Sequence, residues 1–196
     1  MKFEEISELH FITPIANVPS ILQRGILSHN EALRLKAASI ANPVIQQRRQ
    51  NRQFPNGRAL HSYANLYFHA RNPMMCAIQN RRKNLAVLSI DPAVLKLPGV
   101  IVSDGNASGD YTAFYQSPEG LKHLWKDDVF ARDWRSPNLI TYWQQKSARC
   151  AEVLVPDLVE SDFIRSAYVC SVATQSELKR LAPTLLSTLQ PDLFTI

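Results

Sequence analysis

The sequence predicts an α+β protein in which strands and helices are mixed without a regular alternation. Short apolar or alternating runs, typical of strands, occur at 9–13, 64–68, 85–90 and 150–155. Helical segments separate them irregularly, and no repeated strand–helix–strand unit connects them. The 196 residues, 45% of them hydrophobic, suit one domain spanning 1–196 with a core of ordinary size.

In the N-terminal half, Pro14 ends the first strand and a helix follows. Asn17 is the expected N-cap of this helix, and Gly25 the expected stop. The next elements are expected as an extended segment at 26–28, helical segments at 31–38 and 44–52, a strand at 64–68 and a helix entered at 71–73.

In the C-terminal half, the apolar run 85–90 predicts a central strand, and Asp91-Pro92 a helix start. Segment 103–134 shows no clear period, and a long irregular stretch inside a compact domain is often a functional loop. The remaining elements are expected as strands at 100–102, 150–155 and 168–172, and helices at 137–147 and 175–189, the last interrupted at Pro183.

Positive charge is concentrated in one part of the chain. No acid occurs between Glu31 and Asp91, although the whole chain carries a net charge of +5. The interval holds ten cations: Arg34, Lys36, Arg48, Arg49, Arg52, Arg58, Arg71, Arg81, Arg82 and Lys83. Aromatic residues interleave with them, which favours an unpaired nucleic acid over a merely solvated basic face. Trp134 and Trp143, further along, are expected as loop anchors rather than base platforms.

Several other classes of protein and site lack support. No apolar run reaches 18 residues and no signal-peptide core follows Met1, so we expect a cytoplasmic protein without membrane contact. The three cysteines are too far apart to pair by spacing, and the five histidines make no zinc pattern, so we expect no metal. Neither a glycine-rich phosphate loop nor a nucleophile elbow is present.

Glu152 is a single carboxylate inside the apolar run 150–155, which Pro156 closes. Burying an unpaired carboxylate is costly, so its presence needs a physical reason. Two interpretations stay open. Glu152 either faces water or pairs with an arginine as a structural group, or it acts on a substrate at the mouth of a cleft.

Four stretches of the chain, in this order, resemble the DarT family of DNA ADP-ribosyltransferase toxins. They lie at 11–22 with Gly25 and His29-Asn30, at 45–49, at 61–74 and at 151–155. The third is the most specific, because it resembles the family signature H-D-Y-V-P-x-Y-F-x-P-R-S-P-M. It departs from that signature at Ser62, Ala64, Asn65 and Asn72.

The resemblance implies an ADP-ribosyltransferase-like split β-sheet core with peripheral helices and NAD⁺ in its cleft. Glu152 would be the catalytic glutamate, and Arg49 the catalytic arginine and a contact of NAD⁺. The other cofactor contacts it implies are His10, Phe11, Ile12, Thr13, Ser20 and Leu27. Phe11 stands where the family often has a histidine. A packing role for His10 stays open, because a one-residue offset on a strand reverses the face.

The resemblance further implies a toxin that transfers ADP-ribose onto a base, thymine or guanine, of single-stranded DNA. It implies DNA contacts at Arg48, Arg52, Tyr67, Arg71, Asn72 and Lys146. A structural role stays open for Arg71 and a core position for Tyr67. Relatives are paired with a macrodomain antitoxin, DarG, so we expect a DarG-like partner.

The chemistry of the transfer fits these residue types. Cleaving the bond between nicotinamide and ribose places positive charge on the sugar, which a fixed carboxylate stabilises best in a dry site. An arginine stays charged and suits a pyrophosphate or a developing anion. Two rival functions remain: an inactive single-strand-binding module with this fold, and an ADP-ribosyltransferase whose acceptor is RNA or protein.

Overall fold

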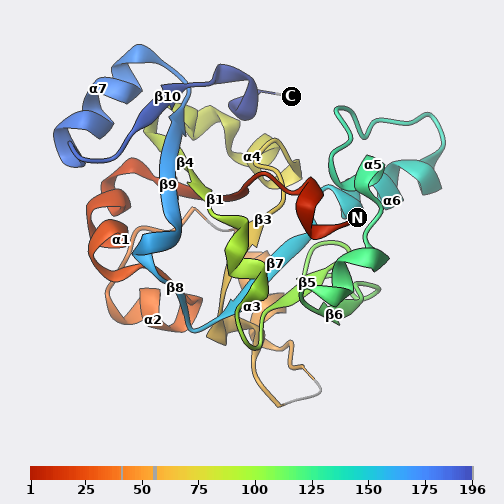
Figure 1. Cartoon of the computed structure of the whole chain (residues 1–196). Helices are drawn as coiled ribbons and strands as arrows, with labels where there is room; N and C mark the ends of the chain where they lie inside the picture. Colours follow the sequence, from red (N-terminus) through yellow and green to blue (C-terminus); the bar gives the residue numbers. More distant parts are fainter. Residues whose placement is uncertain (41, 55–56, 196) are drawn as a thin grey trace.

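The computed structural model describes residues 1–40, 42–54 and 57–195, and an eight-stranded mixed sheet forms its centre (Figure 1). The strand order is β10-β9-β4-β1-β3-β7-β5-β6, and only β10 and β9 among these neighbours run parallel. The strands are β1 (Leu9–Pro14), β3 (Tyr63–Tyr67), β4 (Leu85–Ile90), β5 (Ile101–Ser103), β6 (Phe114–Gln116), β7 (Glu152–Pro156), β9 (Ile164–Val169) and β10 (Ser187–Leu189). A separate ribbon pairs β2 (Ile26–Leu27) with β8 (Leu158–Val159).

Short helices surround the sheet (Figure 1). The α-helices are α1 (Val18–Arg24), α2 (His29–Arg34), α3 (Pro43–Gln50), α4 (Pro73–Ile78), α5 (Lys126–Val129), α6 (Leu139–Ala148) and α7 (Val172–Leu181). The 3₁₀-helices are η1 (Phe3–Glu5), η2 (Ile15–Asn17), η3 (Leu60–Ser62), η4 (Gln79–Asn84), η5 (Pro92–Lys96), η6 (Glu119–His123), η7 (Ser161–Phe163) and η8 (Pro191–Phe194). The predicted α+β class is confirmed.

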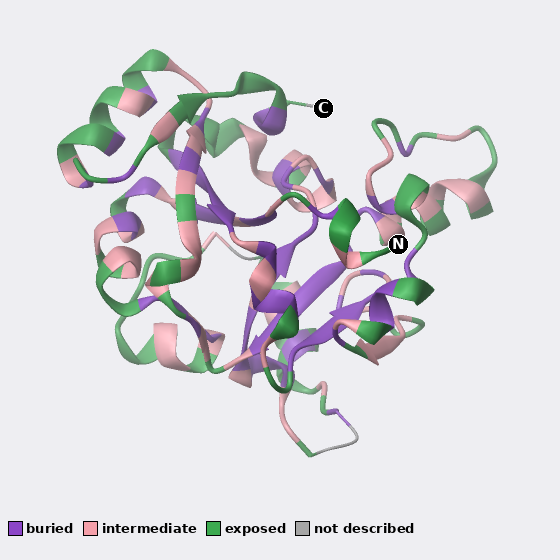
Figure 2. Cartoon of the chain, in the orientation of Figure 1, coloured by how far each residue is buried: buried purple, intermediate pink, exposed green. Residues whose placement is uncertain are grey.

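Both faces of the sheet are buried (Figure 2). Along β7, Val153 and Val155 belong to the largest apolar cluster, with residues of α1, η5 and α7. Leu154 points to the other face, where it packs against Tyr63 and Phe54. Because side chains alternate along a strand, Glu152 shares the face of Leu154 and lies inside the protein rather than at a wet edge.

The sheet is split between its two central strands. β1 pairs with β4 along its whole length, but it meets β3 at one pair, His10 opposite Tyr67. From Phe11 to Pro14, no strand among the described residues pairs with the β3-facing edge of β1. This opening places unpaired backbone groups in the middle of the sheet, where a ligand can reach them.

The C-terminal predictions are wrong in detail. A strand was expected at 168–172, but β9 ends at Val169 and α7 begins at Val172, capped by the Ser171 hydroxyl. The helix expected over 175–189 ends at Leu181, and the chain returns as β10 beside β9. Pro183 explains this end, because proline disfavours a helical conformation at the residue before it.

Two further expectations need correction. Asn17 makes no side-chain cap on α1; its amide instead donates to Ala38 O at 2.8 Å and accepts from Ala38 N–H at 3.3 Å. Segment 103–134 is not irregular throughout, because it includes β6, η6 and α5. Within the described residues, no helix has the length and apolar character needed to cross a membrane.

Candidate active site

Glu152 is the most deeply buried carboxylate of the described chain, with 0% of its surface exposed. Both of its oxygens accept from Arg49 Nη1 at 3.0 Å, and Oε1 also accepts from the Ala107 N–H at 2.9 Å. The Glu152 N–H donates to Ser103 Oγ at 3.1 Å. The carboxylate is therefore paired with Arg49 and held by the Ala107 N–H, as a buried charge requires, while Ser103 fixes the backbone of Glu152.

Arg49 reaches Glu152 from the last turn of α3 and is 6% exposed. Asn42 starts this helix, because its side chain accepts from the Val44 N–H at 2.9 Å and Pro43 occupies the first turn. The neighbouring Arg48 is exposed. Of these two adjacent arginines, the one that contacts Glu152 is Arg49, which the resemblance implied as the catalytic arginine.

The loop at 104–113 supplies Ala107 and is tied together by its own hydrogen bonds. The side-chain oxygen of Asn106 accepts from the Ser108 N–H, and the backbone carbonyl of Asn106 accepts from Thr112 Oγ1 at 2.6 Å. The Asp104 carboxylate accepts from the Ala113 N–H at 2.9 Å. Gly105 packs against α6, since a Cβ there would lie 2.4 Å from Ser147 Oγ. The loop therefore holds its Ala107 N–H in a fixed position beside Glu152.

Two histidines stand beside Arg49. The rings of His29 and His61 are 4.1 Å apart between centroids, and His61 is 8% exposed. Burial lowers the pKa of His61 to about 4, with further lowering by the charges of His29 and Arg49. Burial and Arg49 lower the pKa of His29 as well. Both rings are therefore neutral near pH 7.

Two buried polar atoms in this region have no hydrogen-bond partner among the described residues. They are His61 Nε2 and Gln46 Oε1, and Gln46 lies one turn before Arg49 on α3. Unsatisfied buried polar atoms are rare and call for a physical explanation. A polar ligand beside the Arg49–Glu152 pair would satisfy them.

Tyr67 lies opposite Glu152 on β3, and His10 lies opposite Tyr67 on β1. Directly opposed residues project to the same face, so the three side chains form a row across the sheet. Tyr67 is 8% exposed, and burial together with the charge of Glu152 raises the pKa of its phenol. The prediction that Tyr67 contacts DNA does not fit this buried position, because the ring packs in the apolar cluster of Ile12 and Met75.

The first predicted cofactor stretch borders the split. Ile12 packs into the apolar cluster of α4, Phe11 packs on the opposite face, and Thr13 is 2% exposed. Their side chains are therefore committed to packing, which leaves the unpaired backbone edge as the part that a ligand can contact. Ser20 is exposed on α1 and Leu27 half-buried on β2. His10 lies in a second pocket, described below.

Three of the residues predicted to contact DNA make contacts within the protein instead. Asn72 is 0% exposed and caps α4, accepting from Met75 N–H at 3.0 Å, so the prediction that it contacts DNA is wrong. Arg71 donates to Thr195 O at 2.8 Å and to Arg132 O, which ties two loops together. Arg52 places its guanidinium 5.3 Å from the Phe114 ring centroid.

Lys146 belongs to an exposed aromatic group on α6. Its ammonium lies 4.8 Å from the Trp143 ring centroid and 5.2 Å from that of Tyr142, and it donates to the Tyr142 hydroxyl at 3.0 Å. Trp143 is 56% exposed, so the prediction that it anchors a loop is wrong. Trp134 is 5% exposed under the Arg149 guanidinium and does pack as an anchor.

The sequence analysis did not identify the groups that surround the Arg49–Glu152 pair, namely the Ala107 N–H and the rings of His29 and His61. Ala107 acts through its backbone, which no residue type reports. His29 and His61 are 32 positions apart, and only folding brings them together. Within the described residues, no group of three or more histidine, cysteine, aspartate or glutamate side chains could hold a metal ion.

A double-mutant cycle tests the pairing of Arg49 and Glu152. Either Glu152→Gln or Arg49→Met leaves one buried charge unpaired, so we expect each to lower the free energy of unfolding by about 3–5 kcal/mol. The double variant should lose less than the two single losses combined. Urea denaturation measures all four proteins. The exposed pair of Glu177 and Arg180 on α7 provides the control, since Glu177→Gln breaks a solvent-screened pair and should leave the urea midpoint nearly unchanged. Additive losses would contradict the pairing.

Acid should destabilise the fold through His61. An unfolded histidine titrates near ~6.5, whereas the pKa of His61 in the fold is about 4. As the pH falls through this window, the unfolded chain takes up the proton first, so stability decreases. We expect His61→Asn to show a smaller loss of urea midpoint between pH 7 and pH 5 than the wild type. The exposed His123→Asn is the matched control, and equal losses in all three proteins would exclude this role.

Comparison with known proteins identifies the family. The chain matches the family model "ssDNA thymidine ADP-ribosyltransferase, DarT" over residues 10–190. A DNA ADP-ribosyl transferase–DNA ADP-ribosyl glycohydrolase fusion protein of Thermosipho africanus is 33% identical over 91% of this chain and 46% of its own length. A DNA ADP-ribosyl transferase of Thermus sp. 2.9 is 32% identical over 69% of this chain and 70% of its own. The chain thus spans about half of the fusion protein.

Solved structures show the same fold. Thermosipho africanus DarTG in complex with ADP-ribose superposes with a TM-score of 0.84 at 29% identity, over 96% of this chain and 51% of that one. Thermus sp. 2.9 DarT in complex with ADP-ribosylated single-stranded DNA gives 0.85 at 22% identity, over 99% of each chain. The predicted split-sheet fold is confirmed, and the family match now extends beyond residue 156 to residue 190. The chain belongs to the DarT family of single-stranded DNA thymidine ADP-ribosyltransferases.

Proposed function

We propose that this protein transfers ADP-ribose from NAD⁺ onto a thymine base of single-stranded DNA. The observation that carries the proposal is the buried pair of Arg49 and Glu152 beside the split in the central sheet. Family membership supports the choice of acceptor, because the matching family model is described by thymidine in single-stranded DNA.

The region around Arg49 suits NAD⁺ in its polar chemistry. The unpaired edge of β1 at 11–14 offers backbone donors and acceptors to a carboxamide. The orphaned His61 Nε2 and Gln46 Oε1 offer one imidazole nitrogen and one acceptor beside the guanidinium. A sugar–phosphate ligand carries hydroxyl groups that can hydrogen-bond to these two atoms, and anionic oxygens that can pair with the Arg49 guanidinium.

Glu152 is suited to stabilise the reacting sugar. Transfer breaks the bond between ribose and nicotinamide, forms a bond from the ribose to a ring nitrogen of the base, and releases nicotinamide and a proton. Positive charge develops on the sugar, and the carboxylate that Arg49 and the Ala107 N–H hold in place is the group suited to stabilise it. Its full burial keeps competing water away.

The surroundings of the site favour an unpaired strand. A ring nitrogen of thymine is accessible only when the base is unpaired or flipped out. Arg48 is exposed on α3, and on α6 the exposed Trp143 ring lies 4.8 Å from the ammonium of the half-buried Lys146, so these two helices offer a cation for phosphates and an aromatic face for bases. This supports single-stranded DNA over a protein acceptor.

A partner that removes the modification fits the same proposal. The Thermosipho africanus relative joins a DNA ADP-ribosyl transferase to a DNA ADP-ribosyl glycohydrolase in one polypeptide. We propose that this protein is the toxin of a toxin–antitoxin pair whose antitoxin is a macrodomain of the DarG type. Co-expression with such a glycohydrolase should relieve growth arrest caused by the transferase.

The reaction can be tested on oligonucleotides that each lack one of the four bases. We expect an added ADP-ribosyl mass on every oligonucleotide that contains thymine, and none on the one that lacks it. Glu152→Gln should lower the rate by about 100- to 1,000-fold or more, because it removes the charge facing the sugar. Mass spectrometry with NAD⁺ measures both results.

Glu160→Gln is the matched control, since Glu160 is an exposed carboxylate eight residues along the same segment, and it should keep wild-type activity. An unmodified wild-type reaction with DNA binding retained would favour the inactive single-strand-binding module. Modification of RNA or protein in place of DNA would favour the other rival.

A further inference from the structure

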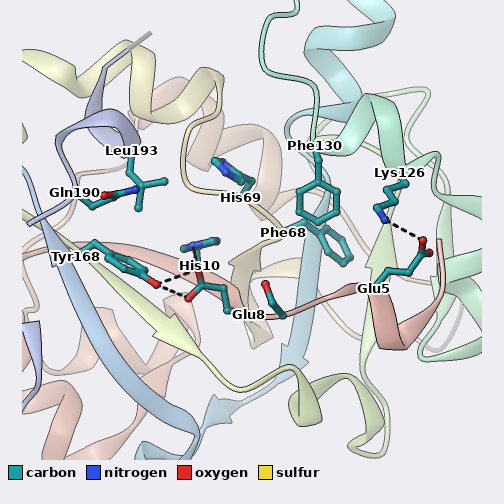
Figure 3. Close-up of a pocket in the computed structure, with 11 residues that line it drawn as sticks. Glu5, Glu8, His10, Phe68, His69, Lys126, Phe130, Tyr168, Gln190 and Leu193 are labelled. Atoms are coloured by element: carbon teal, nitrogen blue, oxygen red, sulfur yellow. Dashed lines mark hydrogen bonds and ion pairs between the residues drawn. The ribbon is translucent and has the colours of Figure 1, made fainter. Parts of the chain in front are cut away.

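A pocket of about 380 Å³ is lined by Glu8 and His10 (Figure 3), which lie at or before the one β1–β3 pair, whereas the unpaired part of β1 follows it. Both termini help to build it. Its walls come from η1 and β1, the end of β3, α5, β9 and the C-terminal segment. The polar and aromatic groups of its lining include Glu8, His10, His69, Lys126, Phe130 and Tyr168. The row of His10, Tyr67 and Glu152 separates it from the Arg49 region by two strand spacings, about 10 Å.

His10 is the unexplained residue of this pocket. It is 3% exposed, yet neither ring nitrogen makes a hydrogen bond with any described residue. Nε2 lies 3.3 Å from Glu8 Oε1, close enough for an ion pair but without hydrogen-bond geometry. Nδ1 has no polar partner among the described residues, and burying it costs free energy, so a bound group that meets it would stabilise the pocket.

Glu8 and His69 each have a defined protonation state in this pocket. Burial raises the pKa of Glu8, but the close contact with His10 and the hydrogen bonds that Ser89 and Tyr168 donate to the carboxylate outweigh it, and the pKa falls to about 2. Glu8 is therefore an anionic acceptor at neutral pH. The Arg71 N–H donates to His69 Nδ1 at 3.0 Å, and burial followed by the charge of Arg149 lowers the pKa of His69 to about 3. His69 is therefore a neutral ring whose proton is on Nε2.

Flat side chains frame these groups. The ring centroid of His10 lies 5.6 Å from that of His69 and 6.2 Å from that of Tyr168, and His69 lies 6.3 Å from Phe130 (Figure 3). Lys126 adds a cation at the rim, where it binds Glu5 at 3.0 Å. A ligand that suits this lining is flat, has donors and acceptors on one edge, and carries an anion on a short arm.

We propose that this pocket binds one unpaired nucleobase that carries an exocyclic amino group. The amino group donates to Glu8, a ring acceptor of the base meets His10 or His69, and a phosphate reaches Lys126. Thymine has no amino group, and its carbonyl oxygens would face the carboxylate, so cytosine, adenine and guanine fit better. The base comes either from the DNA strand that the proposed transferase modifies or from a free nucleotide.

The test uses the wild-type protein without NAD⁺, so that no transfer can occur while binding is measured. Histidine imidazole resonances are followed by NMR while dCMP, dGMP, dAMP, dTMP or a short single-stranded oligonucleotide is added. We expect the His10 and His69 signals to shift with the amino-bearing nucleotides, with the oligonucleotide, or with both, and affinity for dTMP to be at least about tenfold weaker.

Glu8→Gln should weaken this binding by about tenfold, whereas Glu4→Gln, an exposed carboxylate outside the pocket, should leave it unchanged. If Glu8→Gln does not fold, Phe130→Ala removes a half-buried wall and should also weaken binding.

Shifts with the oligonucleotide alone assign the base to DNA, and shifts with mononucleotides alone assign a free nucleotide; both support the pocket. Equal affinity for dTMP overturns the amino-group requirement. The absence of any histidine shift overturns the proposal, whatever the outcome of the transfer assay.

Discussion

The structure depends on one buried ion pair. Arg49 and Glu152 are 103 positions apart in the sequence, and their contact joins α3 to the middle of the sheet. Either charge left alone in this interior would lower the stability of the fold, so the pair and the Ala107 N–H support one another. The contact that compensates the two buried charges also holds the Glu152 carboxylate in one position, away from solvent. In this way a requirement of folding becomes a preorganised site.

The split sheet gives this pair its place. A continuous sheet would have paired the whole edge of β1 with β3, but the contact is limited to His10 opposite Tyr67. The unpaired part of β1 exposes backbone on one side of this row, and a pocket lined by Glu8 and His10 lies on the other. Tyr67, buried at the centre of the row, separates two regions with different polar chemistry.

The sequence could predict the groups whose chemistry conflicts with their surroundings. An acid inside the apolar run 150–155 indicated Glu152, and the resembling stretch 45–49 selected Arg49 over Arg48. Partners that act through backbone or through long-range packing could not be predicted, as with Ala107 and the ring pair of His29 and His61. Asn72 was mistaken for a DNA contact because an N-cap and a surface amide look alike in a sequence. The C-terminal helix was predicted to extend too far, to residue 189, because Pro183 was taken as an interruption of the helix rather than its end.

The most direct test of the account is a crystal structure of the Glu152→Gln protein with NAD⁺. We predict the ribose attached to nicotinamide beside residue 152, with the carboxamide contacting the unpaired backbone of β1 at 11–14. NAD⁺ bound elsewhere, for example in the pocket of Glu8 and His10, with the region around Arg49 unoccupied, would contradict the central claim.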